Sequence, residues 1–77
     1  MLQTLVDVPL GKSVVISNIE KSHISAKLLE LGFTEGTTVE VAFHAPFKDP
    51  IAIELNGSII SLRRDEASTI LVQNNAP

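Results

Sequence analysis

One segment of the sequence resembles a phosphate-binding loop. Gly11-Lys12-Ser13 has the order in which such a loop ends, where backbone N–H groups and a lysine hold phosphate oxygens. The loop also requires a glycine five positions before Gly11, and that position is occupied by Val6. We therefore interpret Gly11-Lys12-Ser13 as a β-turn, and we assign no nucleotide or other cofactor to the chain.

Metal ligation and catalysis have little support in the sequence. His44 and Asp49 form the only imidazole and carboxylate pair in one loop, whereas a metal site needs three or more converging ligands. His23 and His44 are therefore expected to be ordinary surface histidines. Serines and acidic residues are scattered, with no nucleophile beside a base and no grouped carboxylates. The sequence thus predicts neither a metal site nor an enzyme.

Composition and charge exclude further classes. The 77 residues include six Lys and Arg against nine Asp and Glu, and the one adjacent basic pair, Arg63-Arg64, is followed directly by Asp65-Glu66. We therefore expect no nucleic-acid binding. No apolar run approaches the ~20 residues that span a bilayer, and the amino terminus lacks the features of a signal peptide. With no cysteine present, the sequence predicts a cytoplasmic protein that is not embedded in a membrane.

The elements that would position a binding surface begin with a strand and a helix. Residues 13–19 are rich in β-branched side chains and predict a strand. Ser22 is expected to cap a helix at about residues 23–31, which Gly32 ends, with Leu29 on its outer side. The buried stripe of this helix is expected to consist of Ile24, Leu28 and Leu31.

The second half of the chain reads as strands joined by two turns. Residues 37–44 alternate, which places Val39, Val41 and Phe43 on the core face of a strand. Two prolines make residues 45–50 a loop. Asn56-Gly57 predicts a two-residue type I′ hairpin. Its apolar register sets Ile53 opposite Ile60 and Ile51 opposite Leu62.

A helical turn at about residues 64–68 and a strand at 70–72 complete the series, and residues 74–77 are expected to form a frayed tail. We find no repeat or linker, so residues 1–77 are predicted to form a single domain. About five short strands and one short α-helix are too few for a sandwich. The predicted fold is therefore mainly β, in the form of a small barrel.

Four segments in order carry a family resemblance. They are Leu5-Val6-Asp7-Val8-Pro9-Leu10-Gly11, Leu28-Leu29-Glu30-Leu31-Gly32-Phe33-Thr34-Glu35-Gly36, Ala45-Pro46-Phe47-Lys48-Asp49-Pro50 and Ile60-Ser61-Leu62-Arg63-Arg64-Asp65-Glu66-Ala67. Over residues 2–73 the chain resembles the FeoA family, the small cytoplasmic proteins that accompany the FeoB membrane transporter of ferrous iron in bacteria. Departures from the residues usual in these motifs occur at Val8, Glu35, Phe47 and Lys48.

The resemblance implies an SH3-like barrel and an accessory or regulatory role in ferrous iron uptake. It implies docking on the cytoplasmic GTP-binding region of a FeoB-like membrane transporter, without catalysis. We expect the contact to involve the proline-bounded loop and the outer face of the helix. The residues concerned are Lys27, Leu29, Pro46, Phe47, Lys48, Asp49 and Pro50.

Two other functions stay open at this point. The first is a carrier of transition-metal ions, which would act through weak metal binding. The second is a regulatory barrel domain like that of metal-dependent repressors, which FeoA-like domains also form. Because the chain starts at Met1 with no preceding DNA-binding helices, we expect the free-standing protein.

Overall fold

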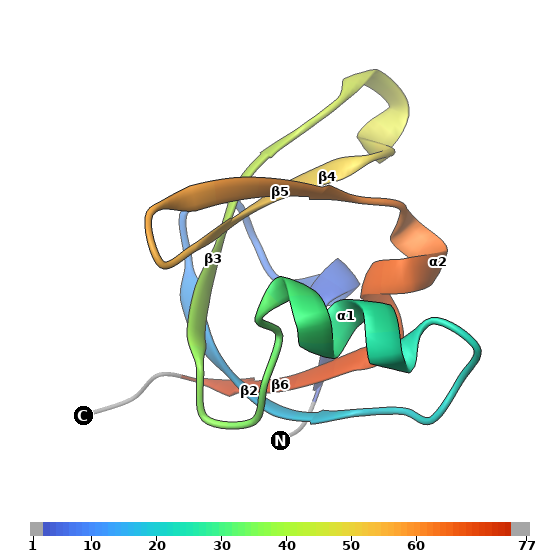
Figure 1. The fold of residues 1–77 in the computed structure, drawn as a ribbon. Helices are drawn as coiled ribbons and strands as arrows, with labels where there is room; N and C mark the ends of the chain where they lie inside the picture. The colour runs from blue at the N-terminus through green and yellow to red at the C-terminus, as the bar shows by residue number, and fades with distance from the viewer. Residues whose placement is uncertain (1–2, 75–77) are drawn as a thin grey trace.

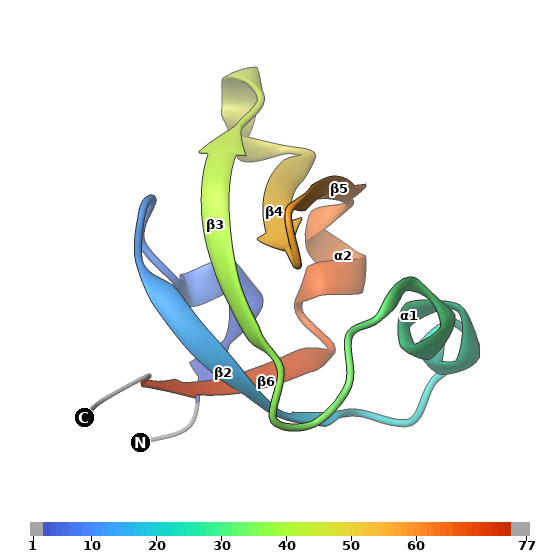
Figure 2. The same ribbon diagram turned by 60° about the vertical axis from the view of Figure 1, so that its left-hand side comes forward.

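The computed structural model describes residues 3–74, which form one antiparallel sheet of six strands with two short α-helices (Figure 1). The strands lie in the order β1-β6-β2-β3-β4-β5. Their bounds are β1 Gln3–Thr4, β2 Ser13–Ile19, β3 Thr38–His44, β4 Ile51–Leu55, β5 Ser58–Leu62 and β6 Ile70–Asn74. The sheet curls strongly (Figure 2). The mainly β prediction is confirmed, and the short β1 adds a sixth strand to the five expected.

The hairpin predicted around Asn56-Gly57 is present in the predicted register. Both turn residues have positive φ angles, 51° and 86°, as a type I′ turn requires. Ile53 pairs with Ile60, and Ile51 pairs with Leu62. This register keeps the apolar side chains on one face, because a shift of one residue would turn them to the other.

The two α-helices are short. α1 spans Ser25–Leu31 and begins later than predicted, because the Ser22 hydroxyl accepts a hydrogen bond from the Ile24 N–H (3.3 Å) and holds a turn there instead. Gly32 ends α1 with a φ of 109°. α2 spans Arg64–Ala67, inside the predicted helical turn. Among residues 3–74, no helix is long and apolar enough to cross a bilayer.

The hydrophobic core lies inside the curled sheet, and its one aromatic member is Phe33, which is fully buried just beyond Gly32. Leu28 brings α1 into the core, and Ile24 packs at its edge. Leu31, predicted to be buried, is exposed, and Phe33, just beyond the left-handed Gly32, is buried. The aliphatic members are Leu5, Val8, Val14, Ile16, Leu28, Val39, Val41, Ile51, Ile53, Leu55, Leu62, Ala67, Ile70 and Val72.

The prediction that Phe43 lies in the core is wrong, since its side chain is 56% exposed. The register of β3 against β4 shifts between Val41, which pairs with Ile53, and Phe43, which pairs with Ala52. β3 therefore has one residue more than β4 at this point. Such a bulge interrupts the alternation of a strand and sends the following side chain to the opposite face.

The predicted frayed tail needs one correction. Asn74 belongs to β6 and pairs with Val14 of β2, so the sheet extends further along the chain than expected. The remaining residues of that tail, 75–77, lie outside the described residues.

Replacing Phe33 with alanine is expected to lower the free energy of unfolding by about 3–5 kcal/mol, because the change removes a fully buried ring and leaves a cavity. The matched variant Phe43→Ala should cost less than about 1 kcal/mol, because that ring lies largely in solvent. Urea denaturation followed by far-ultraviolet circular dichroism measures both. Equal losses in the two variants would contradict the bulged register of β3.

Candidate functional site

The loop between β3 and β4 carries most of the predicted contact residues, and it projects beyond the sheet (yellow in Figure 1). Pro46–Lys48 form a tight turn, η2, whose backbone is not helical at Phe47, and the Lys48 N–H donates to the Ala45 carbonyl (2.8 Å). The Ala45 N–H in turn donates to the Pro50 carbonyl (3.0 Å) and closes the base of the loop. Phe47 at the tip is 99% exposed. Its ring therefore contributes nothing to the core.

The backbone at this tip is strained. Phe47 and Lys48 both have positive φ angles, 67° and 66°. L-residues with a Cβ avoid this left-handed region, which costs roughly 1–2 kcal/mol per residue. Packing does not explain a fully exposed aromatic ring held in such a conformation. Exposed aromatic side chains on strained loops are typical of binding sites.

Asp49 ties the loop to α2. Its Oδ1 accepts a hydrogen bond from the backbone N–H of Arg64 (3.1 Å). Arg64 is the first residue of α2, so this bond satisfies an N–H group that has no partner within the helix. The Arg64 Nη1 donates to the Lys48 carbonyl (3.5 Å). Asp49 was predicted as a partner contact, and the structure gives its carboxylate an internal hydrogen bond. The sequence pattern carried no signal for this tether, because 15 residues separate Asp49 from Arg64.

Lys27 lies on α1, away from the loop. Its Nζ is 3.7 Å from Oε2 of Glu66 on α2, and Oε1 of the same carboxylate accepts the Arg63 N–H (3.0 Å). α2 therefore lies between the loop and α1, and both views show this order (Figures 1 and 2). The predicted contact residues fall into two places joined by α2, rather than into one continuous patch.

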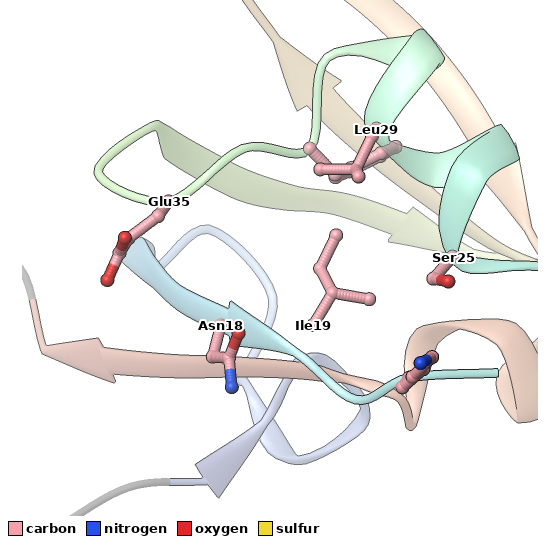
Figure 3. A pocket seen from close by; sticks show the side chains of 7 residues that line it. Asn18, Ile19, Ser25, Leu29 and Glu35 are labelled. Carbon is pink, nitrogen blue, oxygen red and sulfur yellow. The ribbon is translucent and has the colours of Figure 1, made fainter.

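Leu29 borders a hollow of about 250 Å³ between α1 and β2. Figure 3 shows Leu29 on the helix and Ile19 on the strand facing this hollow, with Ser25 and Glu35 towards its two ends. Leu29 is half-exposed, as its place off the buried stripe predicted. The hollow itself arises only where α1 approaches β2 in the fold. Its remaining lining residues are Asn18, Lys21 and Phe33.

The charged side chains of this region do not converge on a single point. Across residues 3–74, no three His, Asp or Glu side chains lie close enough together to hold a metal ion. His44 stands at the end of β3, opposite Ile51, while the Asp49 carboxylate is bound to Arg64. Among the large apolar side chains of residues 3–74, that of Phe47 is the most exposed.

Residues 3–74 match the FeoA domain. A fusion of Fe(2+) transport protein A with the Fe(2+) transporter FeoB from Porphyromonas gingivalis (strain ATCC BAA-308 / W83) is 36% identical over 70 residues, which cover 86% of this chain. The chain spans only 8% of the length of that fusion protein.

Solved structures agree with the fold described above. A FeoA-like protein from Clostridium acetobutylicum superposes with a TM-score of 0.90 at 32% identity, covering 99% of this chain and 90% of that one. FeoA from Stenotrophomonas maltophilia, an SH3 domain protein in complex with zinc, gives 0.83 at 29% identity, with coverages of 92% and 89%. The predicted SH3-like architecture is confirmed. On the match over residues 3–74 and this shared architecture, the chain belongs to the FeoA family.

Proposed function

We propose that this chain is a cytoplasmic, non-catalytic accessory protein of ferrous iron uptake, which docks on the GTP-binding region of a FeoB-like transporter. The observation that carries the proposal is the Porphyromonas gingivalis relative, in which a domain similar to this chain and FeoB are parts of one protein. Fusion raises the effective concentration of one partner at the other, so it suits two surfaces that bind weakly as separate chains.

The proposed docking surface is the loop at Pro46–Pro50, and three of its properties suit this role. Aromatic side chains that enter a pocket of the partner usually contribute the largest share of binding energy in an interface. The Phe47 ring already lies in solvent, so docking requires no opening of the core. The Asp49 and Arg64 contacts hold the loop in place before binding, which reduces the entropy that is lost when the complex forms.

The variant Phe47→Gly tests this surface directly. Glycine accepts a φ of 67° without strain, so the free energy of unfolding should stay unchanged or rise by up to about 1 kcal/mol. Affinity for the soluble GTP-binding region of the transporter should fall about 30-fold, the effect of losing one hot-spot aromatic side chain of about 2 kcal/mol. Isothermal titration calorimetry, with and without guanine nucleotide, measures the affinity.

Phe43→Ala is the matched control for this titration, because it also removes an exposed ring but leaves the loop unchanged. Its affinity should equal that of the wild type. If Phe47→Gly bound as tightly as the wild type, the loop would not be the docking surface. If the wild type bound neither the GTP-binding region nor the intact transporter, the docking function itself would be wrong.

Asp49→Ala tests whether the loop must be held in place. Loss of the hydrogen bond to the Arg64 N–H should cost about 1 kcal/mol of stability, as for a lost helix cap. Affinity for the transporter domain should fall about fivefold although Phe47 is retained, because the freed loop must be ordered on binding. Amide hydrogen exchange of Lys48 and Arg64 reports the release of the loop.

Asp65→Ala is the control for charge, since it removes a carboxylate from the same helix end. Within the part of the chain that the structure describes, the Asp65 side chain makes no hydrogen bond to the loop. The Asp65→Ala variant should therefore bind the transporter domain with the affinity of the wild type. Equal weakening by Asp49→Ala and Asp65→Ala would mean that negative charge, rather than the tether, matters for docking.

A further inference from the structure

The curled sheet has two edges, and they differ. At one edge, β1 is only two residues long. At the other edge, β5 is five residues long and, over the described residues, pairs with β4 alone. β5 is the last strand after β3 and β4, and α1 lies below it in both views (Figures 1 and 2). β5 is therefore the long unpaired edge of the described sheet.

β5 carries no charged residue, no proline and no bulge, three features that commonly protect an edge strand. Its sequence, Ser58-Ile59-Ile60-Ser61-Leu62, contains no charged residue and no proline. Its pairing with β4 runs without a bulge from one end to the other. Natural edge strands are commonly interrupted by a charge, a proline or a bulge, which prevent pairing with another strand. Ile59 is moreover 54% exposed on this strand.

The hairpin geometry determines which backbone groups this edge presents. In a two-residue hairpin the residues that flank the turn, Leu55 and Ser58, exchange both backbone hydrogen bonds, and the following pairs alternate. Ile60 and Leu62 therefore bond to β4, while the N–H and C=O groups of Ile59 and Ser61 point outwards. The next outward N–H in this series, that of Arg63, donates to the Glu66 carboxylate at 3.0 Å, which agrees with the alternation.

We propose that β5 pairs in antiparallel fashion with β5 of a second copy of this chain, about a two-fold axis at Ile60. In that register Ile59 of each copy lies opposite Ser61 of the other, and the two Ile60 residues meet at the axis. All four outward groups of each strand then find partners, so four hydrogen bonds join the copies. The free edge is complementary to itself, which a C2 interface requires.

Charge and area indicate how strong this pairing is. Each chain carries a net charge of −3, but the paired stretch contains no charged residue, so no like charges are opposed within it. Two five-residue strands bury far less than the roughly 1,200 Å² at which stable interfaces begin. The dimer is therefore weak and forms at high local concentration. It uses neither Phe47 nor the proline-bounded loop, so it does not depend on the proposed docking function.

Sedimentation velocity over a wide concentration range, with amide hydrogen exchange at both extremes, tests the pairing on the full chain. The wild type should shift from monomer to dimer as concentration rises, and the Ile59 and Ser61 amides should become protected only at high concentration. Ser61→Pro removes one outward donor from each copy and leaves the bonds to β4 in place. It should weaken dimerisation at least about tenfold, because two of four hydrogen bonds are lost.

A second comparison does not depend on how the chain tolerates that proline. Ile59→Lys and Leu10→Lys change the net charge equally, at side chains that are 54% and 55% exposed. Only the Ile59 variant should abolish dimerisation. A wild type that stays monomeric throughout, equal effects of the two lysine variants, or a dimer whose Ile59 and Ser61 amides exchange as in the monomer would each overturn the proposal. Protection of these amides only when the transporter domain is added would assign the edge to that partner instead.

Discussion

The packing of α1 against the sheet depends on the left-handed turn at Gly32, where the helix ends beside Leu55 of β4. A Cβ on Gly32 would lie 3.0 Å from the Leu55 Cδ2, and the φ of 109° is one that other residues rarely adopt. Glycine here allows α1 to end abruptly against the hairpin, and the next residue, Phe33, enters the core. A chain of 77 residues with three phenylalanines has few other large side chains for filling that space.

The tip of the proposed docking loop lies outside this core. Phe47 is fully exposed, and hydrogen bonds between the loop and Arg64 hold it against α2. The Phe47 side chain can therefore change without loss of the core, whereas a change at Asp49 affects both the loop and the end of α2. The strain of two consecutive left-handed residues is carried by a short segment with a closed base, where the neighbouring hydrogen bonds fix the backbone.

Short-range sequence signals predicted the elements well. Asn56-Gly57 determined both the hairpin and its register, because the turn type and the apolar alternation agree. Gly32 was correctly placed at the end of a helix. Two residues were wrongly placed in the core. One extra residue in β3 reversed the alternation after Val41 and exposed Phe43, and at the end of α1 the buried residue is Phe33 rather than Leu31. A periodic pattern assumes regular geometry, so it fails where a bulge or a left-handed turn intervenes.

Residue types and spacings of a few positions along the chain were enough to predict the mainly β fold class, and four ordered segments were enough to show the resemblance to the family. The exposure of Phe47 and the contacts between distant segments became known from the folded chain. The bond between Asp49 and Arg64, the hollow between α1 and β2, and the unpaired edge of β5 all depend on segments that are distant in sequence. Such contacts form when the sheet curls and brings those segments together, and local periodicity carries no record of them.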